Sequence, residues 1–571
     1  MTMKYTWKIG GEAGFGILTT GSLFSKIASR RGSYIFDFIE YPSLIRGGHN
    51  TYDVTISDTP VHSLKEGVDV LICLNKETYV LHKSKLSSTS RVVYDPDEFT
   101  PEEGVIRVAV PFTKILAELK GQVIMKNTIA LGASLAIFGA DLTELLSIFE
   151  TQFKKKGAEV ISMNQEFAKR GFDMVIQNNI KDIIPALQKK ESGKKIVLNG
   201  NEAFSYGAVA ADCRFYCAYP MTPASTVLTT LAAWGKKTGM VVRHAEDEIS
   251  VINTALGASF AGVRSAVGSS GGGFALMVEA ISLSGITEIP LVIFLSQRPG
   301  PATGMPTWTE QADLLFAVHA GHGEFQKIVL APGDQEEMIL QTIKAFDLAD
   351  VYQVPVIVMS DMLLSEAHKS ISFEKIADFL KTYKPNRGKL VATAEHGYKR
   401  FAVTDDGISP RLIPGDPNNF YQANSYEHLE DGHTTESDIE RIKQVNKRAR
   451  KMNGYLTSDF ILPTVLGDLK QAKTVFIGWG STKGVFLDAE ETAKEKGLSV
   501  AFMHFSHVYP LSKEKLSPLF ADTTKKYILV ENNSEGQFGK LLRMETGISI
   551  EKKVLRYDGR PLTVEAILAE A

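Results

Sequence analysis

Residues 291–307 read L-V-I-F-L-S-Q-R-P-G-P-A-T-G-M-P-T, and this stretch indicates the fold of the middle of the chain. Its first five residues are apolar, so a strand at residues 291–296 would bury both of its faces. Strands of that kind belong to parallel sheets with helices on both sides. Arg298 follows the strand directly, where open α/β sheets bind their ligands. It is therefore a candidate ligand for a carboxylate, with a surface salt bridge as the weaker alternative.

The same alternation of strands and helices extends in both directions along the chain. Around the central strand we expect further strands at residues 196–198, 266–268 and 354–359. The N-terminal part predicts a strand at 5–9, a glycine turn, a helix at 17–29, and strands at 33–38, 52–56, 68–74, 91–94 and 105–109. Near the C-terminus we expect strands at 474–477, 499–504 and 526–530. The sequence therefore predicts a multi-domain α/β protein.

Two polar segments divide the chain. Residues 188–195 are charged and contain a Ser-Gly break, which is typical of a linker. Residues 369–455 are polar and contain several prolines before a charged helix near 437–451, so we interpret them as a connecting segment. The expected domains are therefore residues 1–187, 196–368 and 456–571. His428 and His433 in the connecting segment indicate a solvated loop better than a metal site, and we predict no metal site in this chain.

Composition excludes several classes of function. The 571 residues include 63 basic and 66 acidic ones, which are interleaved and leave a formal net charge of −3. This balance argues against nucleic acid or an anionic membrane as the main partner. The longest apolar runs are far shorter than the ~20 residues that a membrane-spanning helix needs. Three cysteines are too few for a disulfide framework, and no secretory signal is recognisable, so we expect a cytoplasmic protein.

One threonine lies in a loop that two prolines stiffen. Residues 217–228 read C-A-Y-P-M-T-P-A-S-T-V-L, so Pro220 and Pro223 stand on either side of Met221 and Thr222. Proline fixes φ and lacks a backbone N–H, and it also restricts the residue before it. The hydroxyl of Thr222 is therefore presented from a rigid, non-helical loop, where it suits a substrate carbonyl or carboxylate.

Three acidic residues stand at the start of a helix that should be buried. Residues 244–248 read H-A-E-D-E and precede a run of small and apolar residues at 249–260. Acidic residues in a first helical turn oppose the helix dipole, which accounts for Asp247 and extends to Glu246. Glu248 adjoins the most apolar part of the run and would be costly to bury without a partner. It is the candidate functional acid.

Glycine-rich turns follow two of the predicted strands and leave alternatives open. Residues 268–274 read G-S-S-G-G-G-F, where Gly271 and Gly272 permit the close approach of a ligand or only form a turn. The glycines at 11–16 fall as G-x-x-G-x-G, which differs from the dinucleotide fingerprint G-x-G-x-x-G. We therefore favour a structural turn or another phosphate contact there over an NAD site.

An arginine precedes two glycines in the N-terminal part. Residues 41–50 read Y-P-S-L-I-R-G-G-H-N, with Arg46 before Gly47 and Gly48. Arg46 is a candidate contact for a phosphate or a partner, and an ion pair beside a tight turn is at least as good an interpretation.

Three of these motifs together resemble the α subunit of the 2-oxoacid:ferredoxin oxidoreductases, namely those at residues 219–223, 244–248 and 297–307. The segments G-G-E-A-G-F-G at 10–16 and Y-P-S-L-I-R-G-G at 41–48 resemble the γ domain that is fused ahead of α in many of these enzymes. The resemblance covers nearly the whole chain. It implies a γ-type α/β domain, a doubly wound pyrimidine-binding domain and a transketolase C-terminal-like domain.

The resemblance implies an enzyme that uses thiamine diphosphate and is active only with a β subunit. It places the diphosphate, Mg²⁺ and a [4Fe–4S] cluster on that subunit, and this chain has too few cysteines for the four thiolates of a cluster. Coenzyme A is the implied co-substrate, ferredoxin the electron acceptor and (αβ)₂ the expected assembly. The implied 2-oxoacid is 2-oxoglutarate, with pyruvate as the close rival.

The resemblance also implies roles for single residues. Glu248 would hydrogen-bond the pyrimidine ring of the cofactor, with Glu246 as the fallback. Thr222 and Arg298 would hold the 2-oxo and carboxylate oxygens of the substrate. The remaining implied contacts are to the cofactor at Pro220, Gly271 and Gly272, and to coenzyme A or a partner at Arg46, Gly47 and Gly48.

Two departures and two rival functions remain. Met221 replaces the usual isoleucine, which conserves volume, and the glycines at 271–273 replace a glycine-proline ending in a way that bears on substrate choice. The rivals are a non-catalytic assembly subunit and an NAD-linked dehydrogenase. The sequence leaves open the 2-oxoacid, the physiological direction and the contacts to coenzyme A.

Overall fold

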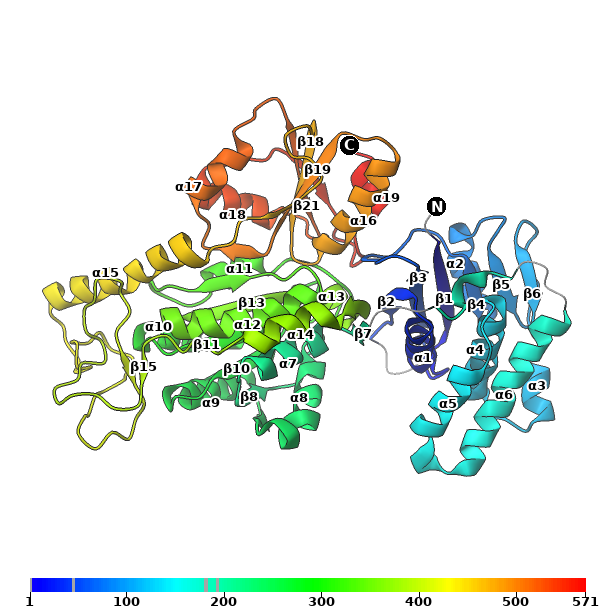
Figure 1. Cartoon of the computed structure of the whole chain (residues 1–571), viewed down its shortest axis with the longest axis horizontal. Coiled ribbons are helices and arrows are strands. Elements are labelled where there is room, and N and C mark those ends of the chain that lie inside the picture. The colour runs from blue at the N-terminus through cyan, green and yellow to red at the C-terminus, as the bar shows by residue number, and fades with distance from the viewer. Residues whose placement is uncertain (1–2, 44–46, 179–182, 191–194) are drawn as a thin grey trace. The chain divides into compact units, whose positions relative to one another are not determined.

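The computed structural model describes residues 3–43, 47–178, 183–190 and 195–571. The chain forms two compact units, the first made of Met1–Leu198 with Ala367–Glu374 and the second of Asn199–Glu366 with Lys375–Ala571. Strands and helices alternate through both units (Figure 1). The predicted α/β class is therefore confirmed. Within the described part of the chain, no helix is both long and apolar enough to cross a membrane.

The first unit is built on a mixed sheet of eight strands in the order β6-β5-β4-β1-β3-β2-β14-β7. β1 pairs in parallel with β4 and antiparallel with β3, so the pairing changes at β1. The strands are β1 (Lys4–Glu12), β2 (Tyr34–Glu40), β3 (His49–Ser57), β4 (Val70–Cys73), β5 (Arg91–Tyr94), β6 (Ile106–Ala109), β7 (Lys195–Leu198) and β14 (Lys369–Ser372). The helices are α1 (Ile17–Arg30), α2 (Lys76–His82), α3 (Phe112–Glu118), α4 (Lys126–Ile137), α5 (Thr143–Gln152) and α6 (Ala158–Gln177).

Apolar side chains cover both faces of this sheet. Trp7 of β1 stacks on Phe24 of α1 with ring centroids 4.3 Å apart, in a core that α4 and α6 extend. Ile72 of β4 belongs to the same core, whereas its neighbour Leu71 packs with Tyr79 of α2 in a separate cluster. Successive residues of a strand point to opposite faces, so helices bury the sheet from both sides.

The strand expected to open the second domain lies in the first unit. Residues 196–198 do form a strand, β7, but it pairs with β14, which in turn pairs with β2. Lys369, expected at the start of a connecting segment, therefore lies inside this sheet. The pattern of polar residues located the strand, whereas the edge it pairs with depends on β14, which is far away in sequence.

The second unit contains a sheet of seven strands in the order β20-β12-β13-β11-β10-β8-β9. All neighbours pair in parallel except β20, which is antiparallel to β12. The strands are β8 (Phe215–Ala218), β9 (Val241–His244), β10 (Ser265–Ser269), β11 (Leu291–Gln297), β12 (Ile328–Leu330), β13 (Pro355–Asp361) and β20 (His507–Tyr509). The helices are α7 (Gly200–Ala210), α8 (Ser225–Thr238), α9 (Glu248–Phe260), α10 (Gly271–Thr287), α11 (Leu314–His319), α12 (Gln335–Tyr352) and α13 (Met362–Glu366).

Helices pack on this sheet as the buried strand of residues 291–297 predicts. Every residue of β11 is buried. α9 packs against α10, whereas α7 packs against α8 and α12 (Figure 1). The expectation of a parallel sheet covered on both sides is confirmed.

The C-terminal part of this unit has its own sheet of five strands in the order β17-β19-β18-β21-β22. Its strands are β17 (Thr464–Leu466), β18 (Thr474–Trp479), β19 (Val500–Phe505), β21 (Lys526–Glu531) and β22 (Lys552–Leu555), and its helices are α16 (Thr482–Glu495), α17 (Lys513–Leu516), α18 (Gln537–Thr546) and α19 (Val564–Leu568). The segment before it contains α14 (Phe373–Thr382), β15 (Leu390–Val391), β16 (Arg411–Leu412) and α15 (Asp438–Gly454). The three strands predicted in this region are all present.

Buried ion pairs fasten this segment to the parallel-sheet domain. Glu288, at the end of α10, contacts Lys447 Nζ at 2.6 Å and Lys451 Nζ at 2.5 Å, and all three side chains are almost fully buried. His428 is also buried and its ring lies 3.8 Å from that of Phe401. Burial lowers the pKa of His428, so this histidine packs as a neutral side chain instead of lying in a solvated loop. Within the described residues no metal-binding group of three or more ligands occurs.

Candidate active site

Four neighbouring parallel strands deliver the predicted site residues to one edge of the sheet. β11, β10, β8 and β9 are adjacent, and parallel pairing aligns their carboxyl ends. The segment that contains Thr222 follows β8, Glu248 follows β9, Gly271 follows β10 and Arg298 follows β11. Residues spread over the sequence therefore meet where α/β sheets bind ligands.

Arg298 and Thr222 are in direct contact. Arg298 Nη1 donates a hydrogen bond of 2.7 Å to the backbone oxygen of Thr222, and both residues are half-buried. Among the described residues, the hydroxyl of Thr222 has no hydrogen-bond partner. The bond leaves Arg298 Nη2 and the threonine hydroxyl to bind a ligand side by side. Pro220 is exposed at the outer part of the same loop.

The three acidic residues before α9 take three different environments. Asp247 caps the helix, since its carboxylate accepts a 2.7 Å bond from the N–H of Ser250, and the predicted capping role is confirmed. Glu246 is exposed. Glu248 is the first residue of α9 and only 3% exposed, with its Oε1 3.4 Å from Ser269 Oγ. It is the one member of the three that burial marks as functional.

The predicted glycine loop is the first turn of a helix. α10 begins at Gly271, directly after Ser270. A Cβ on Gly273 would lie 2.2 Å from Glu248 Oε1 and 2.1 Å from Ser269 Oγ, so only glycine fits beside this carboxylate. Gly272 faces open space toward Met221, whose Sδ lies 4.0 Å from a Cβ built there. The glycines therefore let α10 approach Glu248 and Met221 closely.

Two acidic residues of the site escaped the sequence prediction. Asp313 lies against Gly271, where a Cβ would stand 2.5 Å from Asp313 Oδ2. Burial raises the pKa of Asp313 to about 6, although the charge of Arg298 opposes the shift. Burial and the charge of Asp313 raise the pKa of Glu310 to about 7. The run T-E-Q-A-D at 309–313 carries no pattern that signals this burial, and only the spacing of two acids after the arginine loop could have drawn attention to it.

The N-terminal candidates belong to the first unit. Arg46 lies outside the described residues. Gly47 and Gly48 both have positive φ, and a Cβ on Gly47 would meet nothing within 4 Å. Asp37, which stands where a ribose-binding acid is expected, is fully buried and accepts hydrogen bonds from Tyr52 and Ser25. A structural role for Asp37 disfavours the dinucleotide interpretation of this turn.

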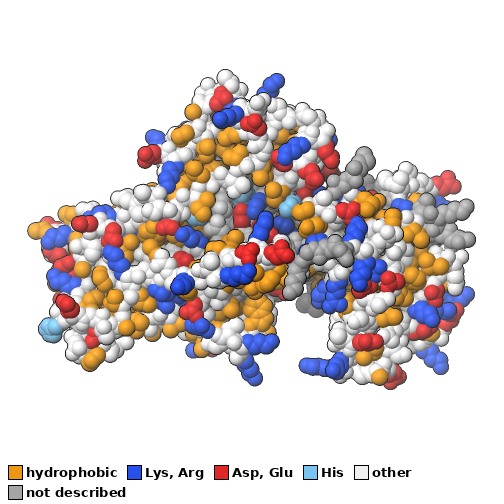
Figure 2. Space-filling model, viewed as in Figure 1, with side chains coloured by type: hydrophobic (Ala, Val, Ile, Leu, Met, Phe, Trp, Pro, Cys, Tyr) orange, Lys and Arg blue, Asp and Glu red, His pale blue; other side chains and the backbone are white. Residues whose placement is uncertain are grey.

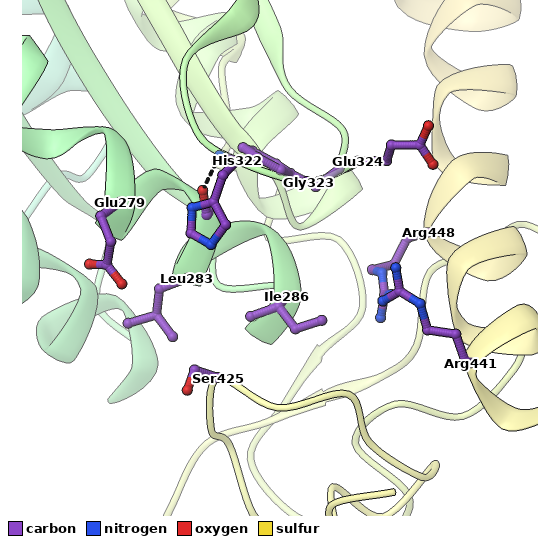
Figure 3. Close-up of a pocket in the computed structure, with 11 residues that line it drawn as sticks. Glu279, Leu283, Ile286, His322, Gly323, Glu324, Ser425, Arg441 and Arg448 are labelled. Carbon is purple, nitrogen blue, oxygen red and sulfur yellow. Dashed lines mark hydrogen bonds between the residues drawn. The ribbon is translucent and has the colours of Figure 1, made fainter. Parts of the chain in front are cut away.

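Two cavities lie away from the candidate active site. One in the first unit has a volume of about 600 Å³, and α1, α4 and α6 contribute to its lining. The other has a volume of about 210 Å³ and lies between the C-terminal half of α10, the loop at residues 321–325 and α15 (Figure 3). Its arginines, Arg441 and Arg448, are both paired with Glu427. None of the site residues of the sheet edge lines either cavity.

The outer face of α9 and α10 is free of basic residues and largely apolar. On α9 the exposed residues recur at one side, at Ile249, Asn253, Gly257 and Phe260. Leu276 on α10 is 50% exposed. Elsewhere, on the face shown in Figure 2, basic and acidic side chains are interspersed. A contiguous apolar surface on two packed helices is typical of a protein interface.

Comparison with known proteins places this geometry among its relatives. Residues 206–448 match the family described as "Pyruvate flavodoxin/ferredoxin oxidoreductase, thiamine diP-bdg", and residues 6–174 match "Pyruvate ferredoxin/flavodoxin oxidoreductase". The chain is 32% identical to the 2-oxoacid:ferredoxin oxidoreductase subunit alpha of a Sulfolobus species, over 98% of this chain and 95% of the relative. It is 27% identical to the 2-oxoglutarate oxidoreductase subunit KorA of Mycobacterium tuberculosis, over 94% of this chain and 86% of that one.

A solved structure has the same fold over the whole length. The 2-oxoglutarate:ferredoxin oxidoreductase from Magnetococcus marinus, with 2-oxoglutarate, coenzyme A and succinyl-CoA bound, is 32% identical with a TM-score of 0.91. The match covers 99% of this chain and 98% of that chain.

Proposed function

We propose a reaction for this chain from one premise: the chain belongs to the family of 2-oxoacid:ferredoxin oxidoreductases, as an alpha subunit. The reaction is the oxidative decarboxylation of a 2-oxoacid with thiamine diphosphate, coenzyme A and ferredoxin, and 2-oxoglutarate is the substrate. One observation carries the proposal: the bond between Arg298 and Thr222 joins two strand ends beside the buried Glu248. The KorA relatives and the 2-oxoglutarate-bound structure support this substrate over pyruvate.

The residues around Glu248 fit the pyrimidine half of thiamine diphosphate. A carboxylate at the start of α9, with a neighbouring helix that only glycine allows to approach, forms a cradle for a flat polar ring. When bound, the cofactor supplies a carbon nucleophile and stores the electrons of the decarboxylated substrate. Glu248 would hold a ring nitrogen and favour the tautomer that removes the thiazolium proton, while Glu246 is too exposed for that role.

Arg298 and Thr222 would orient the substrate. A guanidinium offers donors in a planar fork that matches a carboxylate, and Arg298 uses Nη1 to hold the loop of Thr222. The hydroxyl of Thr222 would then donate to the 2-oxo oxygen. Fixing both oxygens places the carbonyl carbon for attack and contributes through orientation. Pro220, Gly271 and Gly272 keep their proposed positions next to the cofactor.

The other half of the site would lie on a β subunit. Cys73, Cys213 and Cys217 are all buried, and burial raises the pKa of each thiol, so they serve as core residues. We assign the [4Fe–4S] cluster, Mg²⁺ and the diphosphate to the β subunit, which docks on the apolar face of α9 and α10. The assembly is (αβ)₂ and cytoplasmic, where coenzyme A and ferredoxin are available. Gly47 and Gly48, with Arg46, are assigned to coenzyme A or to an interface.

Turnover by the reconstituted complex tests the proposal. The chain is mixed with its β subunit under anaerobic conditions, and CoA-dependent reduction of a viologen dye is followed with 2-oxoglutarate, pyruvate and a branched-chain 2-oxoacid. We expect 2-oxoglutarate to react fastest, and Glu248→Gln to lower kcat by about 100-fold or more because the cofactor loses its proton relay. Asp247→Asn, which retains a capping side chain, is the matched control.

The outcome separates the rival functions. A complex that forms and carries cofactor and cluster, yet turns over none of the three acids, would identify a non-catalytic assembly subunit. Nicotinamide reduction by the chain alone would identify a dehydrogenase.

A further inference from the structure

Glu310 and Asp313 form a pair of carboxyl groups inside the candidate active site. Both side chains are half-buried, and neither carboxyl group has a hydrogen-bond partner among the described residues. The segment is fixed to the end of β11, because the N–H of Asp313 donates a 3.0 Å bond to Gln297 Oε1. Asp313 Oδ2 then lies against Gly271, at the start of α10. The pair therefore has a fixed place in the site and no structural bond that would explain it.

Arg298 is the positive charge that acts on this pair. The charge of Arg298 lowers the pKa of Asp313 against the larger effect of burial, and Asp313 in turn opposes the lowering of the arginine pKa by burial. Glu310 feels the negative charge of Asp313. The other acidic group at this edge is Glu248, across the glycines of α10. Ionised Asp313 is therefore the counter-ion of Arg298 when no substrate is present.

A substrate carboxylate would change this balance. If it binds Arg298, two carboxylates share one guanidinium in a poorly solvated site, and like charges at such separations raise each other's pKa. Protonation of the enzyme's carboxyl group relieves the repulsion at little cost, because the pKa of Asp313 is about 6 and that of Glu310 about 7. Coupled groups of this kind take up a proton as a pair.

We propose that Asp313 and Glu310 are a proton-accepting pair, which neutralises Arg298 in the free enzyme and takes up one proton from solvent when the carboxylate of a 2-oxoacid binds. The proposal rests on the proposed function, since it takes Arg298 as the substrate ligand. It makes Asp313 a determinant of substrate affinity. Above neutral pH the uptake of one proton weakens binding about tenfold per pH unit.

Binding of an unreactive substrate analogue to the αβ complex tests the pair. N-oxalylglycine, which resembles 2-oxoglutarate, is titrated by calorimetry from pH 6 to 8.5 in two buffers with different ionisation enthalpies. We expect close to one proton taken up per site at pH 7.5. In Asp313→Asn the uptake should disappear and the affinity at pH 8 should rise by about tenfold or more, since the competing charge is gone. Glu310→Gln should move the pH dependence to lower pH.

A purely structural role for Asp313 would give another result. Binding that weakens at every pH in Asp313→Asn, or proton uptake that stays unchanged in both variants, would overturn the proposal. Glu324→Gln, an exposed carboxyl group in the loop at 321–325, is the control and should bind and take up protons like the unmodified complex. If the unmodified complex binds neither N-oxalylglycine nor 2-oxoglutarate at any pH, the proposed substrate fails instead. The pH profile of KM against that of kcat provides a second measurement, because the pair should affect KM alone.

Discussion

At the scale of single residues, the site depends on one glycine that gives Glu248 its space. A Cβ at position 273 would overlap both Glu248 Oε1 and Ser269 Oγ. We expect Gly273→Ala to push the carboxylate aside, to lower turnover by at least about tenfold and to destabilise the chain by ~1–3 kcal/mol. Thermal unfolding of the chain and viologen reduction by the complex measure the two effects.

Gly272→Ala is the matched control for stability. The atoms nearest to a Cβ at that position are 4.0 Å away, so the melting temperature should be unchanged or slightly raised. Equal melting temperatures of the two alanine variants would contradict the close contact at Gly273.

The sequence allowed part of this site to be predicted and concealed the rest for a physical reason. Glu248 was recognisable because an acid next to an apolar helix conflicts with its own surroundings. Arg298 was recognisable from its position after a strand that reads as buried. Asp313 carries no such local conflict, because its burial arises from Gly271 and Arg298, which other strands bring to it. Local patterns therefore report residues whose environment is made by their neighbours in sequence.

At the scale of elements, α15 is fastened to α10 by a buried triad. Glu288 binds Lys447 and Lys451, so replacing it would leave two ammonium groups buried without a carboxylate. We expect Glu288→Gln to cost about 3–5 kcal/mol. Lys443→Gln, which breaks an exposed pair with Glu440, should cost less than about 1 kcal/mol. Urea unfolding of the two variants gives the comparison, and a cost for Glu288→Gln as small as that for Lys443→Gln would show that the triad does not hold α15.

The same triad sets an acid limit for the docking of α15. Burial opposes ionisation of Glu288, but the charges of Lys447 and Lys451 outweigh it and hold its pKa well below the ordinary value. A lowered pKa in the folded state gives stability that is complete above the pKa of the unfolded chain and is lost as the pH falls below it. The stability difference between the unmodified chain and Glu288→Gln should therefore shrink below about pH 4.5.

Strands were predictable as elements, whereas their partners were not. The expected strands of the first unit all form, and β1 extends beyond the predicted residue 9 to Glu12. Their apolar runs are a local property. The addition of β7 and β14 to that sheet is a property of edges, because backbone groups of distant segments complete each other's hydrogen bonds. A boundary drawn from polar composition therefore falls at a different place from the boundary of the sheet.

At the scale of the whole molecule, the exposed face of α9 decides whether this chain can complete a site with another. Gly257 lies in the middle of that face, and a Cβ built on it would meet nothing within 4 Å. In the chain alone Gly257→Lys should leave the melting temperature unchanged or higher, since lysine is the better helix former by up to about 1 kcal/mol. Against the β subunit it should weaken binding by at least about tenfold, because an ammonium group would be buried in an apolar interface.

Sedimentation or biolayer interferometry with the β subunit measures this loss, with Glu491→Lys on the exposed side of α16 as the control. Viologen reduction should fall in parallel and recover at high β concentration, because the substitution leaves Glu248, Thr222 and Arg298 in place. Unchanged affinity in Gly257→Lys would move the interface away from α9. The catalytic residues would then have to be completed across a different face of this domain, because the edge that gathers them contains only the pyrimidine half of the site.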